Sequence, residues 1–308
     1  MTRIATAQAN LNTLNQLLRN QSELVSAQND VATGKKATDL KGLVKELGTL
    51  NAARAVISRS ESIIQRIDEL EPRLAVQDQA LGQLAGVADD IRQSLIGSLG
   101  LDDGLNIINN LEASVSQLAI SLNEKFAGRS LFGGTKVGGT PFRASTLDEI
   151  GAAANVADLF NNSDVRQVSR IDDGALVETG FLASEVAGEL VTIIKAIKDF
   201  NDGAGGPFTR TITAAQRSFI EAQLVAISPA LDALHQVQGK NGLLQARLDS
   251  AKVQEEDRQI LLIGVIGDLE DIDLAEAASR LTQAQTAVEA SARTFNVLSN
   301  TSLLNFLS

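Results

Sequence analysis

The chain has 308 residues, a net charge of −11 and 44% hydrophobic residues, with no cysteine, tryptophan or tyrosine and one histidine. The lack of cysteine excludes disulfides and thiol chemistry, and the acidic balance disfavours nucleic acid and anionic membranes, which are bound by clustered lysine and arginine. The longest apolar run, near residues 260–266, is too short to cross a bilayer, so we expect no membrane partner, and we also expect no N-terminal signal peptide.

The N-terminal stretch predicts one amphipathic helix from about residue 4 to residue 33. Leu17, Leu24 and Val31 widen its apolar face, and Gly34 is a natural C-terminal stop. Charged residues are few, so the helix lacks the pairs that normally solubilise an isolated coiled coil. Spacings alternating between three and four predict a seam that packs against another helix, formed by Ile4, Ala7, Leu11, Leu14, Leu18, Gln21, Val25, Gln28 and Ala32.

The next residues predict long helices. Residues 43–99 have a helical apolar pattern, and Pro72 inside it predicts a kink or a one-turn break, because proline removes one backbone hydrogen bond. A shorter helix is expected over about 105–126. Asp102 or Asp103 is placed to cap its first turn.

Residues 129–210 have a different character, with clustered glycine and most of the phenylalanine. Extended-looking runs at 167–171 and 176–178 flank Asp172-Asp173-Gly174, which is a hairpin signal. One helix is expected over about 183–200. We therefore interpret this region as a small insert of loops and strands with one helix.

Helical patterns return after the insert. One stretch starts at Thr213, and Pro229 suits the first turn of a further helix. Asp271 and Asp273 suit the start of the last helix, where a carboxylate meets unpaired backbone N–H groups. The last helix has its own seam with the three-and-four spacing, formed by Leu274, Ala278, Leu281, Gln285, Val288, Ala292 and Phe295.

These patterns predict a mainly α fold, an elongated rod of long helices with a small β-containing insert. The two charge-poor terminal helices are expected to pair as a coiled coil, in parallel or antiparallel orientation. We divide the chain into residues 1–40 and 268–308 as the two halves of a terminal coiled-coil domain. Residues 41–128 and 211–267 are the outgoing and returning halves of the helical rod, and residues 129–210 are the insert.

So much apolar surface at both ends admits two interpretations. The ends either dock on the core of their own domain or bury their surface only in an assembly, and the match between them favours assembly. The predicted assembly interface consists of Ile4, Leu11, Leu14, Leu18, Val25, Leu274, Ala278, Leu281, Val288, Phe295, Leu298, Leu304 and Phe306.

No residue pattern predicts a catalytic, cofactor or metal site. The one histidine, His235, stands in a helical context without a nucleophile, and there is no Cys–His cluster for zinc. Asp268, Glu270, Asp271 and Asp273 form the densest acidic cluster, which we interpret as helix capping and a solvated charge run. A structural or interaction protein is therefore favoured over an enzyme.

Several segments resemble the bacterial flagellin family. Residues 24–35 resemble its N-terminal "L-(S/T)-(S/T)-G-K" segment, residues 271–291 its "D-x-D-x-A…L…Q…A-S" segment and residues 302–307 its closing "S-L-L-x-(F/L)-L". Thr38-Asp39-Leu40 departs from the family, which has a proline there. A further segment resembles the "L-F-x-G…P-F" of the members that join hook to filament, and it is carried by Leu131, Phe132, Gly133, Gly134, Pro141 and Phe142.

The resemblance implies an extracellular structural protein of the flagellum, exported unfolded through a type III channel and assembled through its terminal helices between hook and filament. It implies copies of itself, other hook-associated proteins, flagellin and an export chaperone as partners, and no cofactor. The alternative is a small filament-forming flagellin. An enzyme hidden in the insert is a third hypothesis, disfavoured because the insert has no histidine and no metal motif.

Overall fold

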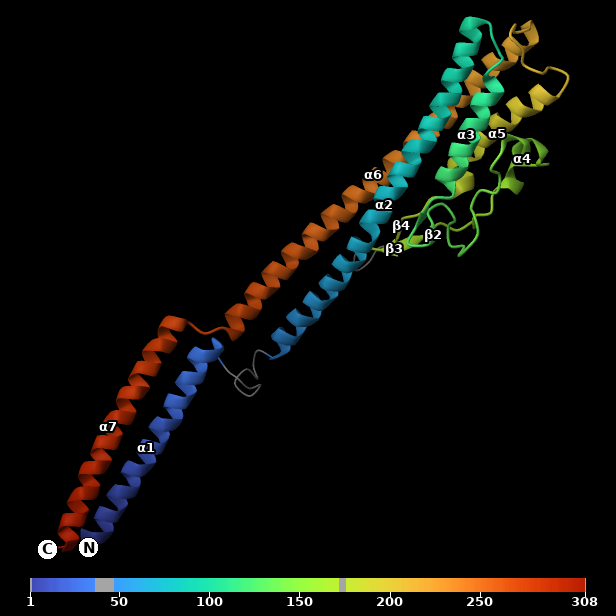
Figure 1. Ribbon diagram of the computed structural model, residues 1–308. Coiled ribbons are helices and arrows are strands. Elements are labelled where there is room, and N and C mark those ends of the chain that lie inside the picture. Colours follow the sequence, from blue (N-terminus) through green and yellow to red (C-terminus); the bar gives the residue numbers. More distant parts are fainter. Residues whose placement is uncertain (1, 37–46, 172–175, 308) are drawn as a thin grey trace. The chain divides into compact units, whose positions relative to one another are not determined.

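Long helices make up most of the protein. The computed structural model describes residues 2–36, 47–171 and 176–307, and the burial of side chains for residue 8 and for residues 11–36, 47–171 and 176–298. The helices are α1 (Thr2–Thr33), α2 (Leu47–Leu101), α3 (Ile107–Leu122), α4 (Leu147–Ala152), α5 (Ala183–Asp202), α6 (Ala214–Glu270) and α7 (Leu274–Leu307) (Figure 1), with a 3₁₀ turn η1 at Val156–Leu159.

Short strands form two antiparallel pairs in the middle of the chain. The pairs are β1 (Lys125–Phe126) with β2 (Arg129–Ser130), and β3 (Val168–Arg170) with β4 (Leu176–Glu178). The predicted mainly α fold with long helices and a small β-containing insert is thus confirmed. The predicted hairpin is present as β3 and β4, and its Asp172-Asp173-Gly174 turn lies outside the described residues.

The chain divides into two compact units. Unit 1 consists of Met1–Ser60 and Asp257–Ser308, and unit 2 of Glu61–Glu256. Both α2 and α6 contribute to each unit, so the division falls inside these helices and not near residues 40 and 267, the predicted boundaries of the terminal coiled-coil domain. The terminal helices belong to unit 1, and the strands belong to unit 2.

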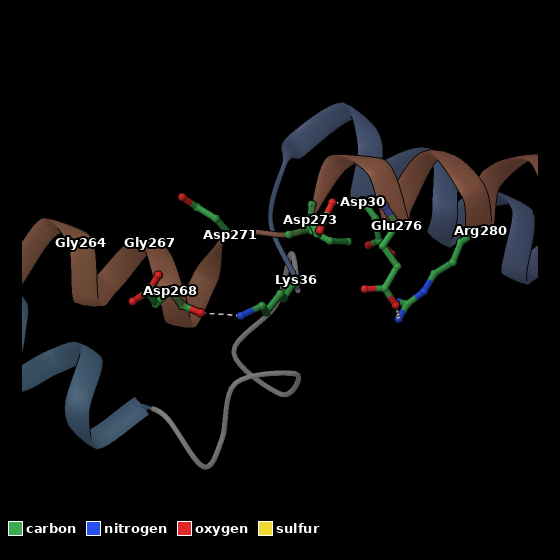
Figure 2. A pocket seen from close by; sticks show the side chains of 10 residues that line it. Asp30, Lys36, Gly264, Gly267, Asp268, Asp271, Asp273, Glu276 and Arg280 are labelled. Carbon is green, nitrogen blue, oxygen red and sulfur yellow. Dashed lines mark hydrogen bonds and ion pairs between the residues drawn. The ribbon is translucent and has the colours of Figure 1, made fainter.

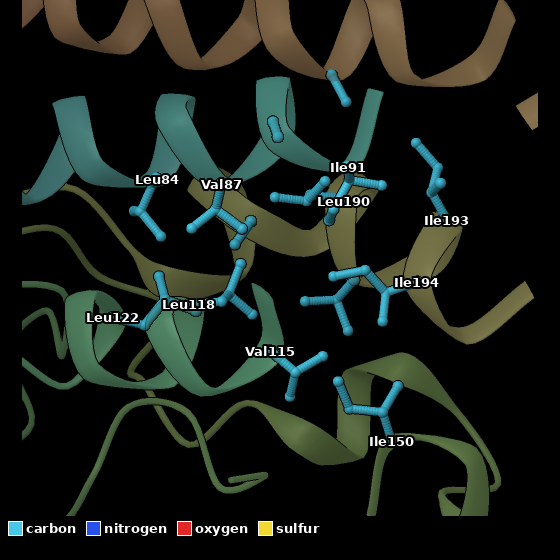
Figure 3. Packing of buried hydrophobic residues seen from close by; sticks show 14 of the residues in the cluster. Leu84, Val87, Ile91, Val115, Leu118, Leu122, Ile150, Leu190, Ile193 and Ile194 are labelled. Carbon is cyan, nitrogen blue, oxygen red and sulfur yellow. The ribbon is translucent and has the colours of Figure 1, made fainter. Parts of the chain in front are cut away.

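The core of unit 2 lies where α2, α3, α4 and α5 meet. Figure 3 shows side chains from all four helices pointing toward one another, among them Leu84, Val115, Ile150 and Leu190, all fully buried. Burying a side chain of this size stabilises the fold by about 1.5–3 kcal/mol. The apolar faces of these four helices therefore form one core.

A second cluster attaches the β3–β4 pair to α2 and α6. Ile171 and Val177 pack there with apolar side chains of both helices. Gln77 of α2 donates to the amide oxygen of Asn241 at 3.0 Å, and Asn241 donates to the Leu74 carbonyl oxygen at 3.0 Å. Because Gln77 and Asn241 are wholly buried, these bonds constrain how α2 and α6 align within unit 2.

Two of the four prolines, Pro72 and Pro229, lie inside continuous helices. α2 continues through Pro72, so the alternative of a one-turn break is wrong. α6 also continues through Pro229, which does not begin a helix as expected. The cost of the missing hydrogen bond is offset by packing, since Leu74 on α2 and Ile227 and Ala230 on α6 are buried.

Two details near the insert differ from expectation. Asp102 and Asp103 do not cap α3, because its N-cap is Asn106 and Asp103 instead accepts a hydrogen bond from the Leu105 N–H at 2.9 Å. The insert also contains α4 and η1 besides the one expected helix. Thr146 and Glu149 start α4 with a capping box, a signature that the sequence contains.

We predict that Gly134→Ala destabilises unit 2 by about 3 kcal/mol, because Gly134 has a left-handed φ of 64° and no room for a side chain. A Cβ there would clash with Ser163 and come within 2.6 Å of the Val165 carbonyl oxygen and 2.7 Å of Leu182. Urea unfolding followed by circular dichroism measures the change.

Gly188→Ala in α5 is the matched control. A Cβ at Gly188 meets nothing within 4 Å, so alanine should stabilise this helix by about 0.5–1 kcal/mol. Equal unfolding midpoints for the two variants would contradict the role given to Gly134.

Candidate functional site

The two terminal helices lie side by side in unit 1. α1 contacts α7, and Figure 1 shows the two helices running alongside each other. Asn20 bonds to Ala287, whereas Lys36 at the other end bonds to Glu270. Because the numbers rise along one helix as they fall along the other, the pair is antiparallel, which settles the open orientation.

Burial defines the contacting face of each helix. On α1, one line of buried and half-buried positions follows steps of four and three, as in a coiled coil: Thr13, Leu17, Asn20, Leu24, Ala27 and Val31. On α7, the matching line is Ala277, Leu281, Ala284, Val288, Ser291, Phe295 and Leu298. The small side chains of Ala27, Ala277 and Ala284 are the most buried and allow the helices to approach closely.

Asn20 provides the polar contact within this seam. Its side-chain amide donates to the Ala287 carbonyl oxygen at 3.2 Å and to the hydroxyl of Ser291. A polar residue in a coiled-coil seam lowers stability but favours one register, because any shift leaves it unpaired. Asn20 therefore constrains the alignment of α1 with α7.

The seam predicted for α1 does not face α7. Leu11, Leu18 and Val25 are 54%, 53% and 55% exposed, and Leu14 is exposed as well. The assignment of this line to the helix pair is therefore wrong, because the neighbouring line through Leu17 has Asn20 and Ala27 to match α7. α1 thus carries two apolar seams and pairs through one of them.

The predicted interface residues of α7 fall into two groups. Leu281, Val288, Phe295 and Leu298 belong to the line that is covered by α1. Leu274 is 61% exposed, and Ala278 is exposed too. The side chains of three further predicted residues lie outside the described residues: Ile4, Leu304 and Phe306.

A short joint connects the base of the helix pair to α6. The Lys36 N–H donates to the Glu270 carbonyl oxygen at 2.7 Å, and the Ile272 N–H donates to the Gly34 carbonyl oxygen at 3.0 Å. Gly34 has a φ of 67°, which suits the glycine that ends α1. The chain leaving α1 is thereby tied to the chain entering α7.

Ion pairs reinforce the joint. Glu270 is 9% exposed and pairs with Arg54 and, at 3.3 Å, with Lys35. Lys35 also pairs with Asp271 at 2.7 Å, and this hydrogen bond raises the pKa of Lys35 above its ordinary value. The acidic cluster is therefore more than a solvated charge run, because Glu270 and Asp271 form ion pairs with lysine and arginine side chains.

An open hollow of about 680 Å³ lies against this joint. Figure 2 shows Lys36 reaching the Asp268 carbonyl oxygen beside it, with Glu276 and Arg280 on α7 opposite. The carboxylate of Asp273 accepts from the Ala275 and Glu276 N–H groups, so the predicted cap of α7 is confirmed. Capping and ion pairing account for the charges around the hollow.

The segment that resembles the junction members lies inside unit 2. Leu131, Phe132 and Phe142 are at most 1% exposed. The Ala183 N–H donates to the Phe132 carbonyl oxygen at 3.0 Å, and Asn123 exchanges two 2.9 Å hydrogen bonds with the backbone of Phe142. Gly133, Gly134 and Pro141 share this environment. These residues hold the insert together and present no side chain to a partner.

The described part of the chain contains no group of three or more potential metal ligands. His235 is exposed on α6, in agreement with a helix-surface position. None of the described helices is long and apolar enough to cross a membrane. The feature that stands out is the paired terminal helices with their exposed second seam.

Comparison with known proteins bears on this feature. Residues 224–307 match the bacterial flagellin C-terminal helical region, which confirms the predicted family resemblance for this part of the chain. No curated protein matches the chain.

Two solved structures share the fold. One, described as a flagellar hook-associated protein from Vibrio parahaemolyticus, is 16% identical with a TM-score of 0.57 over 75% of this chain and 98% of that chain. FlgL from Bacillus cereus is 14% identical, with a TM-score of 0.53 over 71% of this chain and 99% of that chain. At these identities the likeness establishes a common fold.

We predict that Glu270→Gln loosens the joint by about 1–2 kcal/mol, since it removes a buried carboxylate whose cationic partners are themselves partly exposed. Hydrogen exchange at the Lys36 and Ile272 amides should become at least about tenfold faster. Glu276→Gln, which affects only the exposed pair with Arg280, is the control and should leave these amides unchanged. Unchanged exchange in both variants would contradict the role of Glu270.

Proposed function

We propose that the protein is a structural subunit of the bacterial flagellum that joins hook to filament, the role of the third hook-associated protein. The observation that carries this proposal is the exposed apolar seam of α1, on a helix already paired with α7. The match of residues 224–307 to flagellin and the fold shared with two flagellar proteins support it.

The energetics of the seam favour assembly. Leu11, Leu14, Leu18 and Val25 keep between 36% and 55% of their surface in water, and covering such a residue contributes on the order of 1 kcal/mol. A line of this kind recurs in every subunit, so contacts between neighbours multiply the gain. α1 has only three charged residues between residues 4 and 33, which lowers the cost of burying it.

The proposal includes the partners and the location. Copies of the chain, other hook-associated proteins and flagellin would contact it, and an export chaperone would cover the terminal segments before assembly. Residues 1–40 and 268–308 would form the assembly domain of an extracellular, non-enzymatic protein. Membranes and nucleic acid are not among the proposed partners, in keeping with the net charge of −11.

A small filament-forming flagellin is the alternative, which the flagellin description of the matched region favours. Electron microscopy of the purified full-length chain separates the two. Oligomers that extend only isolated hooks would support the junction role, whereas long self-seeding tubes would overturn it in favour of the filament role. A compact particle that assembles under neither condition would contradict both.

We predict that the triple variant Leu11→Gln, Leu14→Gln, Leu18→Gln folds but does not assemble. These side chains lie off the α7 face, so helix content and the exchange protection of α1 should match the wild type. The sedimentable fraction formed with isolated hooks should fall at least about tenfold, because the apolar contact between subunits is lost.

Asn12→Gln, Asn15→Gln, Gln16→Asn is the matched control, because it changes three exposed polar positions of the same helix. This control should assemble as the wild type does. Normal assembly of the leucine triple variant would show that the second seam is not the assembly surface.

A further inference from the structure

Unit 2 carries an arginine-lined pocket that the proposed assembly role does not use. Its volume is about 560 Å³, and it lies between α2 and the two strand pairs. Arg66 and Arg73 come from α2, Arg129 from β2 and Arg170 from β3. Among the described lining residues, Glu69 is the one carboxylate, so the pocket is strongly cationic in a chain whose net charge is −11.

Arg73 is the group that most needs a partner. Its Nη2 is buried and has no hydrogen-bond acceptor in the part of the chain that the structure describes. Burial lowers the pKa of Arg73, and the charge of Arg129 lowers this pKa further, although an arginine remains protonated. Arg73 is half-buried, and a buried N–H group without an acceptor is costly, so an anion that accepts from Nη2 would remove that cost.

The other arginines are also available. Arg66 donates through Nε to the Arg170 carbonyl oxygen at 3.4 Å, so its two terminal nitrogens can donate to a ligand. Within residues 2–36, 47–171 and 176–307, no carboxylate forms an ion pair with Arg73, Arg129 or Arg170. Several guanidinium groups thus surround one pocket, and its one described carboxylate, Glu69, pairs with none of these three.

A strained turn holds one wall in place. Ala127 lines the pocket with a left-handed φ of 47°, and Gly128 follows with 78°, so both residues of the β1–β2 turn have positive φ. A left-handed alanine costs roughly 1–2 kcal/mol, and such strain concentrates at functional positions. The turn places Arg129 on the pocket that Arg73 lines.

The rest of the wall is apolar and identifies the ligand class. Leu70, Pro72 and Phe126 face the same space as the arginines. A guanidinium fork fits a carboxylate in two parallel hydrogen bonds, and an apolar wall fits the side chain next to it. We propose that this pocket binds a carboxylate within an acidic, partly apolar segment of another polypeptide.

In a chain of net negative charge, this cationic pocket favours the binding of an acidic segment. Copies of a chain with 38 acidic and 27 basic residues repel one another, so a cationic pocket gives a neighbouring acidic segment a favourable place to bind. This proposal rests on the proposed function only for the identity of the polypeptide that supplies the carboxylate. Binding itself is measurable on the unassembled chain.

The test is calorimetric titration of the dilute full-length chain with acetyl-Leu-Asp-Leu-amide, its Leu-Asn-Leu counterpart and inorganic phosphate. We expect the aspartyl peptide to bind at least about tenfold more tightly than either other probe, and more weakly as salt is raised. Arg73→Gln and, as a second variant, Arg170→Gln should each weaken binding at least about fivefold. Arg210→Gln, an exposed arginine of unit 2 away from the pocket, is the control and should bind as the wild type does.

Three results would overturn the proposal: no binding of the aspartyl peptide, equal binding of the asparaginyl peptide, or tighter binding of phosphate. Undiminished binding in both pocket variants would do the same.

Asp172 and Asp173 lie outside the described residues, so Asp172→Asn, Asp173→Asn is also measured. Affinity equal to that of the wild type supports a carboxylate from another chain. Peptide binding that is at least about tenfold tighter in this double variant, or that occurs only in it, would assign the pocket to the chain's own aspartates and contradict the proposal. Neither outcome changes the assembly test of the α1 variants.

Discussion

One helix of this protein has more apolar surface than its partner helix can cover. α1 carries two lines of apolar residues that are offset by one position, through Leu17 and through Leu18. α7 covers the first line, in which Ala27 is buried and Asn20 bonds to Ser291. The second line stays in water. An isolated protein gains nothing from this arrangement, whereas a subunit needs one face for its own fold and another for its neighbours.

The joint beneath the helix pair serves the same arrangement. Backbone bonds between Gly34 and Ile272 and between Lys36 and Glu270 tie together two segments far apart in the sequence. The buried Glu270 forms ion pairs with Lys35, which follows α1, and with Arg54 of α2. The pair is thus presented as one body, since neither helix can shift along the other without breaking these bonds and that of Asn20.

Local patterns predicted most of the fold, because apolar periodicity determines which segments are helical and the Asp-Gly turn indicated β3 and β4. The predicted helix start at Pro229 and the alternative of a one-turn break at Pro72 are wrong. The hydrogen bond that each proline removes is a local effect, whereas the packing of Leu74 and Ile227 that offsets it is tertiary. The Thr146–Glu149 capping box was readable in the sequence and marked a helix that the insert was not expected to have.

The candidate site was predictable as a region but not as a face. Two seams with equal spacing look alike in sequence, and only the partner's small residues and Asn20 show which one pairs. The segment around Phe132 resembles that of junction proteins, yet it is buried, so it can act only by shaping the insert. The cationic pocket was invisible in sequence because Arg73, Arg129 and Arg170 converge only after folding.

Thiol accessibility at position 14 tests the central claim most directly, because the chain contains no cysteine. A Leu14→Cys variant and an Asn12→Cys control, both at exposed positions of α1, are labelled with a maleimide before and after assembly on isolated hooks. The two-seam account predicts fast labelling of both variants when unassembled and at least about tenfold slower labelling of Leu14→Cys alone once assembled. Labelling of Leu14→Cys that stays as fast in the assembly as in solution would show that the second seam remains in water, and the account would be wrong.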